Sequence, residues 1–485
     1  MYFNSYYFVL YYLPVLLVGY YILGKHYKPA VAHMWLLAFS VIFCLSHGAW
    51  QTLILAADIA ANYFISRGIS QKSGKNDKVR KLLLVTAILF NIGVLFAFKY
   101  LGFFASVLDM FTKKGYSVTI LIMPLGLSYL AFRMIGYVAD VYKGEQEVPL
   151  FGDFLLYAFY FPMIVQGPIT SSELFLNALK DENHVKFNSD RFAKGLYLFA
   201  MGLLKKMLIA DTLAKSVTWG FENAGRITSA DTILMIIAYT SQLYFDFSGY
   251  CDMANGISEM LGITLPLNFD SPYKSKSLSE EWRRWHITLG DFLRKYIYFP
   301  LGGSKKGTVR TYINIVLVFT ISGFWHGADF TYILWGLASG VIQCFERAFD
   351  KGLSKINGVI RCIGTYILWN ITVLIFRSES LTQFWYLFSG IFIRHDFSVT
   401  HELLQTATTF EIDYLEEHMG ALGEHLSLLH LPVFLLISLI IIFGMKNLYE
   451  KEFKPGVFKA VFVALSLFWC ILSMGGMTTF LYAVY

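Results

Sequence analysis

The stretch YYFVLYYLPVLLVGYYILG (residues 6–24) decides what kind of fold the chain can adopt. It carries no charged side chain, and a helix needs about 20 apolar residues, at 1.5 Å each, to cross the roughly 30 Å core of a bilayer. The first basic residues, Lys25 and Lys28, follow the run. A cleaved signal peptide has its basic residues before the run and a small-residue cleavage site after it. Neither is present, so residues 6–24 predict a retained membrane span.

The same kind of segment recurs along the chain. Of 485 residues 56% are hydrophobic and 15% charged, against about 25% charged in soluble domains, so most of the surface cannot face water. We expect segments near 6–24, 33–46, 48–66, 82–98, 117–138, 154–169, 192–213, 230–247, 311–327, 330–347, 358–376, 431–446 and 456–474. With re-entrant or interfacial helices included, this predicts an all-α, polytopic integral membrane protein of about 10 to 13 helical segments. We find no repeat or linker, and therefore expect one membrane domain over residues 1–485.

Basic residues in short loops predict the orientation of the chain. Lys25, Lys28 and the loop 67–81, which holds six Lys or Arg and one Asp, fall on the same side if two spans separate them. Positive residues favour the cytoplasmic face. The insert 394–430 is the longest polar stretch, and its helix formers predict a helical hairpin or surface helix outside the bilayer.

Several function classes lack support. The five cysteines show no CxxC spacing, which argues against a disulfide framework or a zinc site. HExxH, GxSxG, GxGxxG and P-loop patterns are absent from the sequence, so we expect no metal and no bound cofactor. The net charge of +6 is spread over short loops, and therefore predicts no nucleic acid partner.

The stretch 277–307 predicts an amphipathic helix near residues 278–297. Ser277 and Glu280 form a capping-box pattern, and Pro300 closes the segment. Trp282, His286, Leu289 and Leu293 share one stripe at helical spacing. Such a helix can be an interfacial anchor whose basic face meets lipid headgroups. An anchor needs no histidine on its apolar stripe, so a functional and a structural role for His286 stay open.

His326 ends an apolar run that begins at Tyr312, with Trp325 before it and Asp329 three residues later. An ionisable side chain at membrane depth indicates function, and burial favours the neutral imidazole, which can act as a general base. The alternative is a histidine that only bonds a neighbouring helix.

Together these stretches resemble the membrane-bound O-acyltransferase family, in its bacterial alginate O-acetyltransferase branch. EEWRRWHITLGDFLRKYIYFPLGG (280–303) is followed by FWHGADFTYILWG (324–336). LPLNFDSPYKSKSLSEEWRRWH, QLYFDFSGYCDMANGISEMLGI, FYFPMIVQGPI and MPLGLSYLAFRMIGYVADVYKGE fit the same branch. The resemblance is clearest over residues 120–376, with an additional C-terminal membrane region over 377–485.

The resemblance implies a bacterial cytoplasmic-membrane enzyme that moves an acyl group, most simply acetyl, from a cytoplasmic thioester such as acetyl-CoA to an exported polysaccharide such as alginate. In the family, the histidine matching His326 is catalytic, lies deep in a central tunnel, and is accompanied by a second important histidine that matches His286. Relatives typically work with an extracytoplasmic esterase-like protein that completes the transfer, so we expect such a partner.

Other residues receive supporting roles. Basic side chains would hold donor phosphates at the cytoplasmic surface: Lys274, Lys276, Arg283, Arg284, Arg294 and Lys295. The tryptophans Trp282, Trp285 and Trp325 would line the tunnel, and Asp329 has the spacing to orient His326. Asp246 and Asp252 lie at an apolar segment, where acids are costly. They either line the tunnel or, as we favour, pair with arginines of neighbouring helices.

Alternatives remain at this point. Within the enzyme class, the donor can be D-alanyl on a carrier protein and the acceptor teichoic acid, or the acceptor can be peptidoglycan. The long region past residue 376 argues against the shorter D-alanyl branch. A secondary transporter would also bury His and Asp, but transporters commonly show an inverted repeat, which we do not find. A noncatalytic scaffold leaves His326 without a task.

Overall fold

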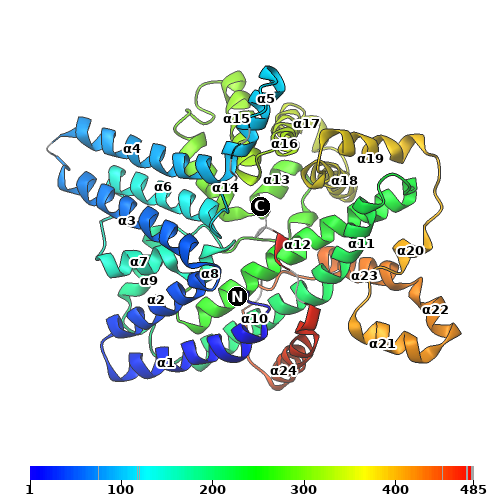
Figure 1. Cartoon of the computed structure of the whole chain (residues 1–485), viewed down its shortest axis with the longest axis horizontal. Coiled ribbons are helices and arrows are strands. Elements are labelled where there is room, and N and C mark those ends of the chain that lie inside the picture. Colours follow the sequence, from blue (N-terminus) through cyan, green and yellow to red (C-terminus); the bar gives the residue numbers. More distant parts are fainter. Residues whose placement is uncertain (75, 117, 119–120, 451, 477–478, 482–485) are drawn as a thin grey trace. The chain divides into compact units, whose positions relative to one another are not determined.

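The computed structural model describes residues 1–74, 76–116, 118, 121–450, 452–476 and 479–481. Residue 75 of the expected 67–81 loop, and residues 117, 119 and 120 of the expected segment 117–138, lie outside that set. All named elements in the described residues are helices, which confirms the all-α class (Figure 1). The chain forms two compact units: residues 1–199, 253–267 and 294–296 make unit 1, and residues 200–252, 268–293 and 297–485 make unit 2.

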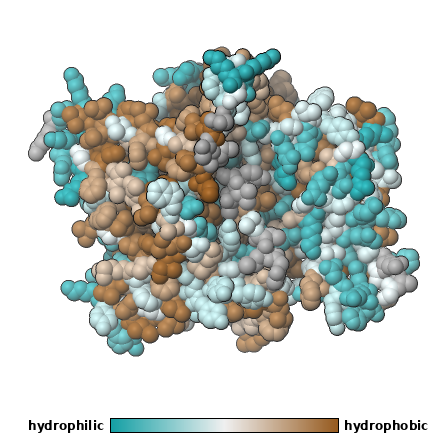
Figure 2. All heavy atoms as spheres, in the orientation of Figure 1, coloured by the Kyte–Doolittle hydropathy of each residue, from teal (hydrophilic) through white to brown (hydrophobic). Residues whose placement is uncertain are grey.

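Five helical stretches are long and apolar enough to cross a membrane. They are Tyr7–His26, Asp77–Thr112, Thr308–His326, Gly358–Arg377 and His425–Gly444. Shorter apolar helices cover Pro29–Leu45, Leu381–Ile393 and Val457–Leu472. Large apolar side chains stand exposed on these segments, among them Val18, Leu89 and Phe458. Figure 2 shows hydrophobic residues, in brown, over much of the surface in view. Such a surface fits lipid and not water.

Unit 1 is an assembly of helices packed through aromatic rings. Phe161 contacts the rings of Phe8 and Phe43, at 6.0 and 5.5 Å between centroids. Its elements are η1 (Tyr7–Tyr12), α1 (Leu13–His26), α2 (Pro29–Leu45), α3 (Ala49–Gln71), α4 (Asp77–Leu95), η2 (Phe96–Tyr100), α5 (Leu101–Thr112), α6 (Leu127–Lys143), α7 (Phe151–Phe159), α8 (Phe161–Ile164), α9 (Ser172–Lys180) and most of α10 (Ser189–Leu204).

Two expected segments of unit 1 are shorter than predicted. In the described part of the segment 117–138 the helix begins at Leu127, and 154–169 is divided between α7 and α8. The chain turns sharply after α8. Gly167 lies at this turn, and a Cβ on it would lie 2.3 Å from the Pro162 carbonyl oxygen. Gly167 therefore permits a close backbone approach where the chain leaves α8.

Unit 2 holds the helices that carry the predicted site. Its elements are η3 (Lys205–Ala210), α11 (Asp211–Glu222), most of α12 (Ser229–Met260), η4 (Pro272–Lys274), α13 (Leu278–Arg284), α14 (Ile287–Leu293), α15 (Thr308–His326), α16 (Phe330–Ala348), α17 (Asp350–Leu353), α18 (Gly358–Arg377), α19 (Leu381–Ile393), α20 (His401–Leu404), α21 (Phe410–Met419), α22 (Ala421–Ser427), α23 (His430–Leu439), η6 (Ile440–Gly444), α24 (Val457–Leu472) and η7 (Ser473–Gly476). Helix η5 (Arg294–Tyr298) contributes residues to both units. The short helices α20 to α22 confirm that the insert 394–430 is helical.

Helices α15 and α16 pack closely because glycines line their interface. A Cβ on Gly323 would lie 2.2 Å from the Tyr332 carbonyl oxygen, and one on Gly336 would lie 2.3 Å from that of Phe319. Small residues let membrane helices approach at backbone distance. This contact fixes the end of α15, where His326 lies.

Candidate functional site

His326 is the last residue of α15 and lies in a set of aromatic rings contributed by three helices. Its ring is 4.8 Å from that of Trp325, 5.2 Å from Trp335 on α16, and 5.5 Å from Phe376 on α18. The side chain is only 4% exposed. The prediction that His326 lies buried among apolar residues is confirmed.

The prediction of one helix over residues 278–297 is wrong in one respect, because the helix breaks at His286. Helix α13 ends at Arg284, α14 begins at Ile287, and His286 between them has φ +45°. The predicted start is confirmed, since Ser277 Oγ accepts the Glu280 N–H at 3.0 Å. A left-handed conformation is uncommon outside glycine and is kept only where the surroundings hold it.

An extended segment at residues 268–270 stabilises the break between α13 and α14. The Asp270 N–H donates to the Arg284 carbonyl at 2.9 Å, and the Ile287 N–H donates to the Asn268 carbonyl at 3.0 Å. The Asn268 side chain also accepts from the Thr288 N–H at 3.2 Å and from its hydroxyl at 3.0 Å. These bonds replace the helical bonds that α13 and α14 would share. The break brings His286 to face α12 and α15.

The Trp325 ring contacts the rings of both histidines. Its ring lies 6.4 Å from His286 on one side and 4.8 Å from His326 on the other. The His286 ring also lies 4.8 Å from Phe247 on α12. We call this set, His286, His326, Phe247, Trp325, Trp335 and Phe376, the histidine cage. The structure thus brings together the two predicted histidines, which are 40 residues apart in sequence.

His286 is neutral in these surroundings. It is 1% exposed, and burial lowers its pKa to about 3. A neutral imidazole carries both a lone pair and an N–H, and it can accept or donate a hydrogen bond. The cage therefore supplies a group that can bind a polar substrate without placing a positive charge there.

The predicted tunnel tryptophans lie beside the cage. Trp282 contacts Trp335 at 5.4 Å, and Trp285 contacts Trp369 on α18 at 5.1 Å. Asp329 is the N-cap of α16, where it accepts the Thr331 N–H at 3.0 Å. Its role in orienting His326 stays a prediction.

The basic residues expected at the donor mouth differ in how they are engaged. In unit 2, Lys274 donates to the Met445 carbonyl, and Arg284 pairs with Glu280 at 3.0 Å. The other two in this unit, Lys276 and Arg283, are exposed.

The remaining two basic residues belong to unit 1. Lys295 lies between Asp140 and Glu145, with 2.8 Å to each carboxylate, and Tyr296 donates to Asp140 at 2.7 Å. Arg294 is exposed. Lys295 thus already has two anionic partners, which argues against its use as a free phosphate ligand.

Asp246 and Asp252 form ion pairs, as we favoured, but with lysines instead of arginines. Lys206 lies 2.7 Å from both Asp246 and Asp211, and Lys205 lies 2.6 Å from Asp252. We call these five residues the lysine–aspartate cluster. Each partner keeps the other from being a buried uncompensated charge, so these acids need no catalytic role to account for their lysines.

The sequence reasoning missed several residues of the site. Asn268 holds His286, Trp335 and Phe376 line the cage, and Lys205 and Lys206 neutralise the buried acids. The two lysines lie within the expected apolar segment 192–213, and an unexplained charge there was a usable signal. Asn268 gave none, because an asparagine in a polar loop is ordinary.

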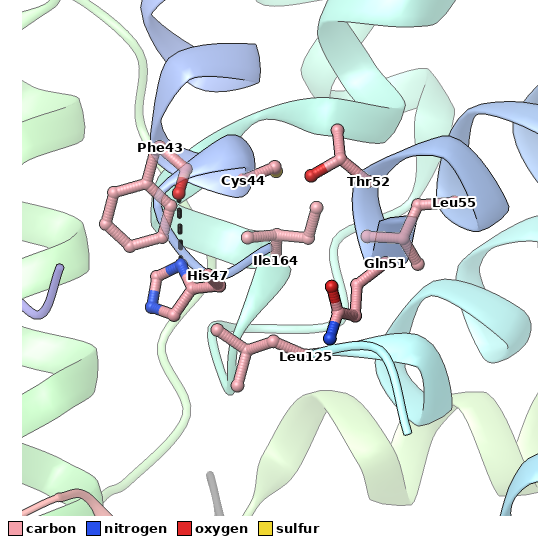
Figure 3. A pocket seen from close by; sticks show the side chains of 8 residues that line it. All are labelled: Phe43, Cys44, His47, Gln51, Thr52, Leu55, Leu125 and Ile164. Atoms are coloured by element: carbon pink, nitrogen blue, oxygen red, sulfur yellow. Dashed lines mark hydrogen bonds between the residues drawn. The ribbon is translucent and has the colours of Figure 1, made fainter. Parts of the chain in front are cut away.

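A separate small pocket lies wholly within unit 1 (Figure 3). There His47 Nδ1 donates to the Phe43 carbonyl at 3.0 Å, and the side chains of Gln51 and Thr52 face the same space. Its lining is Phe43, Cys44, His47, Gln51, Thr52, Leu55, Leu125 and Ile164. It contains none of the predicted site residues.

Comparison with known proteins identifies the family. The model of the membrane-bound O-acyltransferase family matches residues 137–382. A peptidoglycan O-acetyltransferase of Helicobacter pylori is 32% identical over 485 residues, covering 93% of this chain and 91% of that protein. A probable alginate O-acetylase of Pseudomonas aeruginosa is 35% identical and covers 81% of this chain and 75% of that protein. A teichoic acid D-alanyltransferase of Bacillus subtilis is 30% identical, with 48% of this chain and 62% of that protein covered. The chain therefore belongs to the membrane-bound O-acyltransferase family and is a multi-pass membrane O-acyltransferase.

Proposed function

We propose that this enzyme transfers an acetyl group from cytoplasmic acetyl-CoA to a hydroxyl of a cell-envelope polysaccharide outside the cytoplasmic membrane. The observation that carries the proposal is the histidine cage, in which His286 and His326 both pack on Trp325. Peptidoglycan is the first acceptor to test, because the relative named for it aligns over nearly the whole of both chains. An alginate-like polysaccharide is the second, because those relatives align over less of their length.

His326 is the proposed general base. A sugar hydroxyl is a poor nucleophile at neutral pH, and a base within hydrogen-bond reach typically contributes about 10²–10⁴-fold. The imidazole takes the hydroxyl proton as the oxygen attacks the thioester carbonyl carbon. The carbon–sulfur bond then breaks, and the thiolate leaves with that proton. His286 is proposed to position the donor.

The exposed basic side chains Lys276 and Arg283 are the strongest candidates for holding donor phosphates, since Lys274, Arg284 and Lys295 already have partners. The sequence resemblance further supports an extracytoplasmic esterase-like partner protein, which would receive the acetyl group or complete its transfer to the glycan.

Orientation in the membrane is testable with single cysteines at Ser73 and Lys305, in a background without the five native cysteines. Both should resist a membrane-impermeant thiol reagent in intact cells and react after permeabilisation, because the positive-inside rule places both loops in the cytoplasm. Labelling of either one from outside would contradict a cytoplasmic donor mouth.

Two measurements test the activity itself. The purified protein should release thiol from acetyl-CoA in the presence of acceptor glycan, and mass spectrometry should find O-acetyl esters on the glycan only in cells that carry the gene. D-alanyl esters in place of acetyl esters would favour the alternative function, which is D-alanyl transfer from a carrier protein to teichoic acid. Absence of donor consumption with every acceptor would contradict the proposal.

A further inference from the structure

Glu281 is a fully buried acid that has no described partner for its carboxylate. It lies in α13, directly before Trp282, and is 0% exposed. Among the residues that the structure describes, neither carboxylate oxygen finds a hydrogen bond. An ionised carboxylate in such surroundings costs several kcal/mol, so a buried acid without a cation is held in its neutral form.

A second glutamate also favours the neutral form of Glu281. Glu346 on α16 accepts from the Leu278 N–H at 2.6 Å, and from the Ser279 N–H and hydroxyl at 3.0 Å each. Three donors stabilise its negative charge. Burial first, and then the charge of Glu346, raise the pKa of Glu281 well above its usual range. Glu281 consequently keeps its proton and presents an O–H donor.

Further buried polar atoms on α13 and α16 have no hydrogen bond within the described residues. They are Trp282 Nε1 on α13, and Trp335 Nε1 and Ser339 Oγ, one turn apart on α16. The Trp282 and Trp335 rings are 5.4 Å apart, and Trp335 lies 5.2 Å from His326. Buried polar atoms in folded proteins nearly always have a partner. Ring contacts therefore lead from Trp282, the residue next to Glu281, through Trp335 to His326, and the polar atoms on these helices are available to bind a polar ligand.

The donor fits this place better than the acceptor does. The exposed residue Arg283 lies two positions from Glu281 on the same helix, and Lys276 lies just before that helix. A thioester donor that carries phosphates would bind these cations, and its acyl arm offers carbonyl oxygens, which only accept hydrogen bonds. An ionised carboxylate would repel that donor, whereas a neutral carboxyl group can donate to it.

We propose, on the basis of the O-acyltransfer function above, that the Glu281 carboxyl group binds the acyl-thioester donor by donating a hydrogen bond to one of its carbonyl oxygens. Glu281 is thus a donor-binding residue between the basic end of α13 and His326. The nearest alternative is a structural acid satisfied by water alone.

The test compares Glu281→Gln with Glu281→Leu. The amide of Gln keeps an N–H donor in the same shape, and Leu removes it. We expect Glu281→Gln to keep the KM for acetyl-CoA near the wild-type value at neutral pH, and Glu281→Leu to raise it about tenfold, the worth of one hydrogen bond. Glu379→Leu, an exposed site in unit 2, is the matched control and should change nothing.

A pH series separates ligand binding from packing. In the wild type, KM should rise with pH once Glu281 begins to lose its proton, whereas the Glu281→Gln profile should stay flat over the same range. Binding of coenzyme A to a His326→Ala background measures donor affinity without turnover. Wild-type affinity in Glu281→Leu, or identical pH profiles for the wild type and Glu281→Gln, would overturn the inference. A wild type that binds donor but never transfers it would instead overturn the proposed function.

Discussion

The lysine–aspartate cluster and the histidine cage both bury polar side chains in unit 2, but they surround them with different groups. In the cluster, Lys206 lies 2.7 Å from two carboxylates. In the cage, the neighbours of His326 that lie across helices are the aromatic rings of Trp335 and Phe376. Opposite charges at contact distance neutralise each other, and the loss of one partner would leave a buried charge, whereas the ring contacts of His326 involve no charge. The fold therefore depends on each partner of the cluster, and the cage is where we propose that proton transfer takes place.

The largest expected effect is on acyl transfer, and it distinguishes the histidine cage from the lysine–aspartate cluster. His326→Ala should reduce acyl transfer by at least about 100-fold, because it removes the general base. The free energy of unfolding should fall by much less than the activity does, through the cavity that the shorter side chain leaves. His326→Gln, which keeps most of the volume, is the control for packing. Thiol release and the midpoint of thermal unfolding should be measured on the same preparations, and more than a tenth of wild-type activity in His326→Ala would contradict the assignment.

Lys206→Met should show the opposite pattern. It leaves Asp246 and Asp211 without their common cation, and a buried charge without its partner costs about 3–5 kcal/mol. We expect low yield and a lowered unfolding midpoint in detergent, with turnover per folded molecule close to the wild type. The double variant Lys206→Met with Asp246→Asn should recover part of the loss. A stable Lys206→Met protein without activity would show instead that the cluster takes part in catalysis.

Asn268→Ala should affect the cage through the backbone. The change removes the acceptor of the Thr288 N–H and hydroxyl, and an unsatisfied buried donor costs about 1–3 kcal/mol. Because these bonds hold His286 at φ +45°, activity should fall further than stability accounts for. Asn447→Ala, which loses one bond to the Phe269 carbonyl and one from the Tyr449 N–H, is the matched control. Equal activity in the two variants would mean that the break at His286 needs no side-chain support.

Glu281→Gln should give the smallest effect, a pH-dependent gain in stability. Because the pKa of Glu281 is raised in the folded protein, its contribution is fully present below the pKa of the unfolded chain and is lost as pH rises toward the folded pKa. The wild type should lose up to about 1.4 kcal/mol per pH unit over that window, and Glu281→Gln should not. Unfolding midpoints of both proteins across that range measure the difference, and parallel curves would mean that Glu281 is ionised in the fold.

Local features of the site could be predicted from sequence, and long-range ones could not. The cap at Ser277 and the burial of His326 follow from residues within a few positions, and both are confirmed. The break at His286 depends on Asn268 and Asp270, which pair with the helix from outside it. Periodicity alone extends a helix through such a point.

The contact between His326 and Trp335 could not be predicted either. It depends on how closely α15 and α16 pack. Gly323 and Gly336 each begin a GxxxG spacing, which is typical of a close helix contact but does not say which helix is the partner. Arginines were expected as the partners of Asp246 and Asp252. The lysines that pair with these acids precede them by about 40 residues, and only the fold brings them together.

The central claim is that the cage passes an acyl group from a donor on one face of the membrane to an acceptor on the other. The most direct measurement uses proteoliposomes of one orientation with radiolabelled acetyl-CoA on the basic-loop side and acceptor glycan on the opposite side. The wild type should acetylate the glycan only when donor is on the basic-loop side, and His326→Ala should give no signal. Transfer that requires donor and acceptor on the same face, or that survives in His326→Ala, would contradict the account.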